Sequence, residues 1–201
     1  MKRYLFCAGL MLALVCPALF ADTLQFSSGV YPEYGSYYVG PYTMIYTPTG
    51  STTGQYLDLW CVSFYENQTS GAWPVTLVNE TGVTPYEQYA WLAMSVGSTF
   101  DGFLVTNDIA TWAIWYLVDP TDVLAYWKTN GFPTSFTSDV VSLADNAGLY
   151  TGTITLYQDS GIDQNMIGVG GVPVPEPNSI ILLGLAVLVI GFAVKRCGGL
   201  A

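Results

Sequence analysis

Few residues in this sequence are able to do chemistry, and Cys61 stands out among them. It lies in the segment Trp60-Cys61-Val62 of a chain of 201 residues that contains no histidine. Without histidine, Ser-His-Asp catalysis, Cys-His catalysis and His-based metal sites are excluded. A single cysteine beside large apolar residues is typical of a small buried hydrophobe, and a nucleophile is the alternative.

The carboxylates are numerous, but no motif selects a pair of them. Glycoside hydrolysis needs two carboxyl groups at a defined separation, and calcium loops need a regular DxDxDG spacing. Asp119, Asp122, Asp159 and Asp163 are candidate calcium ligands without that spacing. We therefore predict no catalytic residue, no metal and no cofactor, and a non-enzymatic protein. A secreted hydrolase that acts through carboxylates is the alternative.

Charge is distributed very unevenly along the chain. All 15 acidic residues lie between Asp22 and Glu176, and only one of the 5 basic residues, Lys128, lies there with them, which makes a net charge of −14. Such a surface repels phosphate backbones, so a nucleic-acid partner is excluded. The acidity predicts a soluble, well-hydrated exported part.

The first half of this acidic part predicts strands. Residues 23–30, 36–47 and 55–66 are rich in β-branched and aromatic residues, with Gly and Pro between them. The segment TPTGSTTG, residues 47–54, predicts a loop, and residues 72–79 predict a further strand.

The middle of the chain changes to a helical period. Residues 86–97 follow Pro85 and predict a helix. A second predicted helix is capped by Asn107 or Asp108 and runs to Val118, where Asp119-Pro120 ends it.

Two shorter helices and a strand complete the pattern. Residues 121–128 predict a helix capped by Thr121 or Asp122, and residues 135–149 predict one that ends at Gly148. Residues 152–158 return to a strand. We therefore expect an α+β domain over residues 22–167, with antiparallel strands, central short helices and a late strand.

The N-terminus has the pattern of a secretory signal peptide. Lys2 and Arg3 precede an apolar stretch, and small residues follow it. We expect cleavage after Ala21, with Ala18 as the alternative, so that residues 1–21 are removed by the secretion machinery.

The C-terminus carries a second targeting pattern. After a Gly/Pro linker, residues 168–178, the run 179–194 has no charged residue and spans about 24 Å as a helix. A helix that is apolar on every face is typical of a membrane span. The tail 195–201 opens with Lys195 and Arg196, which act as a membrane stop signal and place residues 22–178 outside.

The order of these C-terminal parts resembles the PEP-CTERM sorting signal. Here it reads Pro175-Glu176-Pro177, then the apolar run, then Lys195-Arg196. The resemblance implies an exosortase as processing partner, transient membrane tethering by the C-terminal helix, and a final location at the cell surface or in the extracellular matrix. A permanently anchored surface protein is the alternative.

The exported domain resembles, more weakly, the thioester domains of surface adhesins. The matching residues are Trp60-Cys61-Val62, Ala90-Trp91-Leu92 and Thr111-Trp112-Ala113-Ile114-Trp115. The resemblance implies a thioester-like position at Cys61 and a covalent adhesin-like module as an alternative function. The glutamine that such a bond needs is replaced by Thr111, which has no carboxamide to acylate a thiol.

Aromatic residues are abundant enough to suit sugar stacking, so exopolysaccharide is a candidate partner. Trp91, Trp112 and Trp115 lie on predicted helices beside apolar neighbours, and we expect them in the core. An exposed aromatic patch is expected instead at Tyr31, Tyr34, Tyr37 and Tyr38.

Overall fold

Strand β4, Tyr42–Thr47, shows how the sheet of this domain is built. Its residues alternate between buried and half-buried, because successive side chains of a strand point to opposite faces. Tyr42, Met44 and Tyr46 face the interior and are fully or almost fully buried. The computed structural model describes residues 21–27, 33–34, 37–64, 71–159 and 164–170.

Six strands close into an antiparallel barrel in the order β1-β4-β5-β10-β9-β6. Closure comes from β1, which pairs with β4 on one side and with β6 on the other. Strand β1 is Asp22–Phe26. The other barrel strands are β5 (Gln55–Cys61), β6 (Trp73–Asn79), β9 (Ile154–Asp159) and β10 (Met166–Val169). Two small hairpins, β2–β3 (Glu33–Tyr34, Tyr37–Tyr38) and β7–β8 (Thr99–Phe100, Phe103–Leu104), lie outside the barrel.

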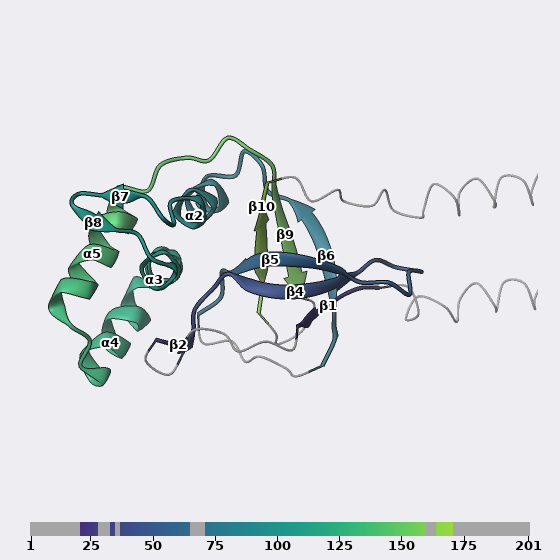
Figure 1. The fold of residues 1–201 in the computed structure, drawn as a ribbon, viewed down its shortest axis with the longest axis horizontal. Coiled ribbons are helices and arrows are strands. Elements are labelled where there is room, and N and C mark those ends of the chain that lie inside the picture. Colours follow the sequence, from purple (N-terminus) through teal and green to yellow (C-terminus); the bar gives the residue numbers. More distant parts are fainter. Residues whose placement is uncertain (1–20, 28–32, 35–36, 65–70, 160–163, 171–201) are drawn as a thin grey trace, which may run out of the picture.

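Four helices gather at one end of the barrel, between β6 and β9 in the chain (Figure 1). They are α2 (Thr84–Met94), α3 (Asn107–Val118), α4 (Pro120–Asn130) and α5 (Thr134–Asp145). Helix α3 is the central one: it contacts α2, α4 and α5, and every residue from Ile109 to Trp115 is buried. A helix that is buried on all faces explains why this segment is so uniformly apolar.

The α+β class is confirmed, as are the strands at residues 73–79 and the loop between β4 and β5. The predicted strand 36–47 is interrupted, because Pro41 has no N–H to donate and the Gly40 N–H turns away to Thr111. One late strand was expected, whereas the structure has two, β9 and β10. Strand β10 ends at Val169, two residues beyond the expected domain end at 167.

The helix ends correct several expectations. The N-cap of α3 is Thr106, whose hydroxyl accepts from the Ile109 N–H (3.3 Å), and not Asn107 or Asp108. The N-cap of α4 is Asp119, whose carboxylate accepts from the Asp122 N–H (3.0 Å), and not Thr121 or Asp122.

The first and last helices also differ from the prediction at their ends. Helix α2 begins at Thr84, two residues before the predicted start, and ends at Met94. Helix α5 ends at Asp145, before the predicted Gly148. Gly148 is needed instead for close packing, since a Cβ there would lie 2.8 Å from Trp91 Nε1.

Candidate functional site

The predicted sorting motif lies outside the described residues. This holds for Pro175, Glu176 and Pro177, for the run 179–194 and for the stop signal Lys195 and Arg196. Within the described ranges no helix is long and apolar enough to span a membrane. The described chain ends at Gly170, one residue after β10 and a few residues before the triplet.

Ala21, the predicted signal cleavage residue, is exposed and stands directly before β1. The folded barrel begins at the next residue, because Asp22 pairs with Val75 of β6. The Asp22 carboxylate accepts hydrogen bonds from the Tyr46 hydroxyl (2.9 Å) and from the N–H (2.7 Å) and hydroxyl (2.8 Å) of Thr49. Asp22, the first residue after the predicted cleavage site, therefore fixes the start of β1 to the end of β4.

Two tyrosines meet beside this carboxylate. The rings of Tyr46 and Tyr157 pack edge to face at 5.6 Å, and both side chains are almost fully buried. Burial, followed by the hydrogen bond and the charge of Asp22, raises the pKa of Tyr46 well above its usual value. Burial and then the Asp22 charge raise the pKa of Tyr157 to about 12. Both phenols therefore keep their protons at alkaline pH values where an exposed tyrosine begins to ionise.

Cys61 is the last residue of β5 and is 1 % exposed. Its thiol donates to the Ser63 carbonyl (3.0 Å), and the Ser63 N–H points back to the sulfur (3.4 Å). The next turn is tied to β10, since the Val62 N–H donates to the Asn165 carbonyl (3.0 Å) and the Asn165 N–H to the Ser63 hydroxyl (3.1 Å). A thiol in this position packs as a small apolar group and is shielded from reagents in water.

Thr111, at the position where the adhesin resemblance calls for glutamine, is also fully buried. Its hydroxyl accepts a hydrogen bond from the Gly40 N–H (3.1 Å), which connects α3 to the turn before β4. A buried backbone donor is thereby satisfied, as folding requires. The side chain at this position joins the helices to the barrel.

The aromatic residues of the helical end form one packed cluster. Tyr37 packs edge to face on Trp112, Trp115 and Tyr126, and it stacks on Phe64. Tyr37 is therefore half-buried and packs against the core, contrary to the expected exposed patch. Tyr31 and the side chains of Tyr34 and Tyr38, the other members of that patch, lie outside what the structure describes. The expected core position is confirmed for Trp112 and Trp115, whereas Trp91 is only half-buried.

Sequence reasoning missed two features. One is the set of hydrogen bonds from Tyr46 and Thr49 to Asp22. No local sequence pattern predicts them, because Tyr46 and Thr49 lie 24 and 27 positions after Asp22. The other is a cavity between α4 and α5, whose lining includes Lys128. The sequence did single out one residue of this cavity, because Lys128 is the single basic residue between the two targeting ends. In the described part of the chain, no group of three acidic, cysteine or histidine side chains is arranged to hold a metal.

Comparison with known proteins identifies the C-terminal segment. Residues 173–196 match the family described as the PEP-CTERM protein-sorting motif. The match covers Pro175-Glu176-Pro177, the apolar run and Lys195-Arg196, as the sequence resemblance implied. This motif is that of exported proteins processed by an exosortase and located at the cell surface or outside the cell. No curated protein matches the chain.

Among solved structures, the fold is similar to the N-terminal domain of the Streptococcus pyogenes pilus tip adhesin Cpa. The two share 12% identity, with a TM-score of 0.44, over 76% of this chain and 95% of the other. This neighbour is a domain of a pilus tip adhesin. A likeness at this level carries no chemistry over to Cys61.

Proposed function

We propose that this protein is exported, sorted through its C-terminal signal and displayed at the cell surface or in the extracellular matrix. The observation that carries the proposal is the match of residues 173–196 to the PEP-CTERM protein-sorting motif. A signal peptide ending at Ala21 and an acidic exported part with a single lysine support export. In this proposal the exosortase acts near Pro175–Pro177, and the run 179–194 tethers the chain only until then.

The exported domain acts, in this proposal, without catalysis. The most reactive side-chain type available, the thiol of Cys61, is buried at the end of β5. The buried tyrosines hold their protons, and Thr111 is engaged with Gly40. These residues support the barrel and its junction with the helices, which leaves binding through the surface as the supported activity.

The sorting proposal is tested by the intact mass of the protein in each fraction of its native host. We expect a membrane-associated precursor that ends at Ala201 and a surface or medium form that ends near Pro175–Asn178. The double variant Pro175→Ala/Pro177→Ala should accumulate as the precursor. Pro74→Ala, which changes an exposed proline of β6 outside the matched segment 173–196, is the control and should be processed normally. A wild-type protein found only as the full-length membrane form would show a permanent anchor and overturn the proposal.

The structural role of Cys61 is tested by thiol titration of the purified chain. A maleimide should label Cys61 slowly in the native protein and fully after denaturation, because the thiol is buried. The intact mass should show no loss of ammonia, the product that leaves when a thiol and a carboxamide form a thioester. A mass lower by one ammonia, with a residue 61 that resists labelling in denaturant and a normal mass in Cys61→Ala, would establish the covalent adhesin-like alternative.

A further inference from the structure

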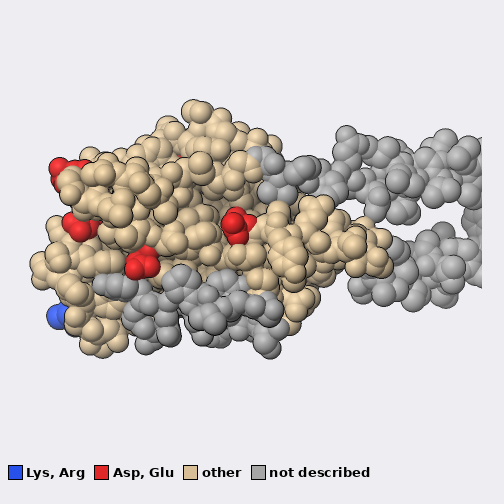
Figure 2. All heavy atoms as spheres, in the orientation of Figure 1, with Lys and Arg blue, Asp and Glu red and all other residues tan. Residues whose placement is uncertain are grey.

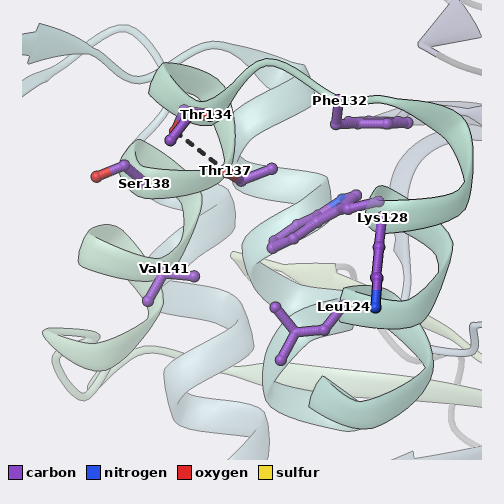
Figure 3. Close-up of a pocket in the computed structure, with 8 residues that line it drawn as sticks. Leu124, Lys128, Phe132, Thr134, Thr137, Ser138 and Val141 are labelled. Atoms are coloured by element: carbon purple, nitrogen blue, oxygen red, sulfur yellow. Dashed lines mark hydrogen bonds between the residues drawn. The ribbon is translucent and has the colours of Figure 1, made fainter.

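A cavity of about 410 Å³ opens between α4 and α5, at the helical end of the molecule. It is wide open to solvent, so a ligand bound there is covered on one side only. The lining comes from both helices and from the loop between them, as Figure 3 shows. The lining residues are Leu124, Trp127, Lys128, Phe132, Thr134, Thr137, Ser138 and Val141.

The walls of this cavity differ in chemistry. Apolar side chains from both helices and the loop form its larger part, and Trp127 among them carries a buried indole N–H without a partner among the described residues. On the α5 side lie Thr134 and Thr137, and the Thr137 hydroxyl donates to the Thr134 carbonyl (3.1 Å). Ser138 also lines this side, but Figure 3 shows its hydroxyl pointing away from the cavity. An aromatic and apolar lining beside hydroxyl-bearing side chains matches a sugar ring, which has C–H faces and hydroxyl edges.

The single positive charge of the described residues stands at the same cavity. Lys128 is exposed on α4, and Figure 3 places it across the cavity from the α5 hydroxyls. Acidic side chains lie at this end as well: Figure 2 shows Asp and Glu side chains on the helical end near the single lysine, and α4 and α5 carry Asp122 and Asp139. Among the described residues an anionic group finds its one positively charged partner here, within a surface that is otherwise acidic. Lys128 offers a point charge that can pair with a carboxylate on the ligand.

The cavity also lies far from the tether. The strand that leads toward the sorting motif, β10, belongs to the barrel, whereas α4 and α5 lie at the opposite end of the described molecule (Figure 1). The nine residues 170–178 extend at most about 30 Å, so a tethered chain keeps its barrel near the membrane. In the tethered precursor the helical end is therefore the part of the described molecule farthest from the linker, where extracellular material can reach it.

We propose that the cavity between α4 and α5 binds an acidic sugar, a uronate unit of an extracellular polysaccharide. The carboxylate of the uronate pairs with Lys128, its ring packs on the apolar wall, and its hydroxyls lie at the α5 side beside Thr134 and Thr137. This inference rests on the proposed surface location, which supplies the polysaccharide, but its chemistry is set by the cavity alone.

The test is calorimetric titration of the full chain in detergent with tri-galacturonate. We expect binding that weakens as salt is raised, because an exposed ion pair is screened. The neutral methyl ester of the same trisaccharide should bind at least about tenfold more weakly, since the charge-assisted hydrogen bond is lost. Lys128→Gln should show the same loss, and Lys128→Arg should retain binding.

Gln55→Glu is the matched control for net charge. It changes the charge by the same amount as Lys128→Gln but lies on β5, at an exposed position of the barrel, away from the cavity. Equal weakening in the two variants, equal affinity for the methyl ester, or no binding at millimolar sugar would overturn the proposal. So would an acidic hexapeptide that binds through Lys128 while the sugar does not. Because this titration uses purified protein, its failure leaves the sorting result in the host unaffected.

Discussion

At the scale of single residues, the barrel depends on one carboxylate that three donors share. Asp22 receives the hydroxyl of Tyr46 and two hydrogen bonds from Thr49, so it ties the start of β1 to the end of β4. Tyr157 lies against Tyr46, yet its buried hydroxyl has no partner among the described residues. The two tyrosines are equally buried, but only the Tyr46 hydroxyl makes a hydrogen bond to Asp22. Mutation of each to phenylalanine therefore isolates the effect of that hydrogen bond.

We expect Tyr46→Phe to lower the free energy of unfolding by about 1.5–3 kcal/mol, since a hydrogen bond to a charged group is lost. Tyr157→Phe should leave it unchanged or raise it, because a buried polar atom without a partner is removed. Urea unfolding of both variants at pH 7 measures the difference. A loss in Tyr157→Phe as large as that in Tyr46→Phe would contradict the assignment of the hydrogen bond.

Alkaline pH should destabilise the protein through the same two phenols. Their pKa values are raised in the folded state, so at high pH the folded protein binds more protons than the unfolded one. The stabilisation is complete below the ordinary tyrosine pKa of about 10 and is lost as pH rises through the folded pKa of Tyr157, about 12. Each phenol contributes a slope of up to about 1.4 kcal/mol per pH unit.

Urea unfolding between about pH 9 and 11.5 checks this expectation, with the ordinary tyrosine pKa as the onset. Tyr157→Phe should flatten the decline relative to the wild type, and Tyr56→Phe, which changes a 72 % exposed tyrosine, should not. A decline that is identical in all three proteins would show that other groups cause it.

At the scale of elements, the helical end is built from short helices whose caps are shared or adjacent. Asp119 ends α3 through its N–H, which donates to the Trp115 carbonyl (2.8 Å), and begins α4 through its carboxylate. One residue therefore sets the angle between two helices. The position of α4 matters for the proposed sugar site, because Lys128 and one wall of the cavity belong to this helix.

Removal of the caps should be costly at the positions that the structure identifies. Thr106→Ala and Asp119→Ala should each lower the free energy of unfolding by about 1 kcal/mol. Asn107→Ala and Thr121→Ala, at the neighbouring positions that local sequence favours, are the controls and should cost clearly less. Urea unfolding of the four variants measures these differences in free energy. Larger losses in Asn107→Ala and Thr121→Ala than in Thr106→Ala and Asp119→Ala would place the helix starts one or two residues further along the chain.

The end of α4 depends on a glycine conformation. Gly131 follows the helix with φ 66° and ψ 40°, the left-handed region that costs a residue with a Cβ about 1–2 kcal/mol. We expect Gly131→Ala to lower the free energy of unfolding by about that amount and Gly131→Asn to cost less. Thermal unfolding followed by circular dichroism measures both. Equal stability of Gly131→Ala and wild type would contradict the left-handed cap.

At the scale of the whole molecule, barrel and helices share one apolar core. The buried cluster includes barrel residues such as Leu24 and Met44 and helical residues such as Trp112 and Leu143. Tyr37, Phe64 and the Gly40–Thr111 hydrogen bond connect the two parts. Neither part keeps its apolar surface covered without the other, so the domain should behave as one cooperative unit.

Unfolding in urea should therefore be a single transition, with coincident midpoints for far-ultraviolet circular dichroism and tryptophan fluorescence. Trp112, Trp115 and Trp127 report mainly on the helices and Trp60 and Trp73 on the barrel. A helical transition that precedes the loss of barrel structure would contradict a shared core.

Much of the element pattern follows from local composition. Residues 42–47 alternate as a half-covered strand, and residues 107–118 are too apolar and too long for anything but a buried helix, so both were predictable. The caps were not, because Thr106 and Asn107 are both good N-cap residues and only the observed hydrogen bond distinguishes them. Strand β10 was missed because its four residues sit among glycines and become a strand only by pairing with β5 and β9.

The sequence by itself determined the destination of this protein and the class of its fold. Pro175-Glu176-Pro177, the apolar run and Lys195-Arg196 form a contiguous signal that is legible without a structure, since targeting machinery reads linear order. Tertiary structure alone decided the closure of the barrel, the burial of Cys61 and Thr111, and the cavity beside Lys128. These features depend on contacts between residues far apart in the chain, such as the 71 positions between Gly40 and Thr111, and local patterns do not encode such distances.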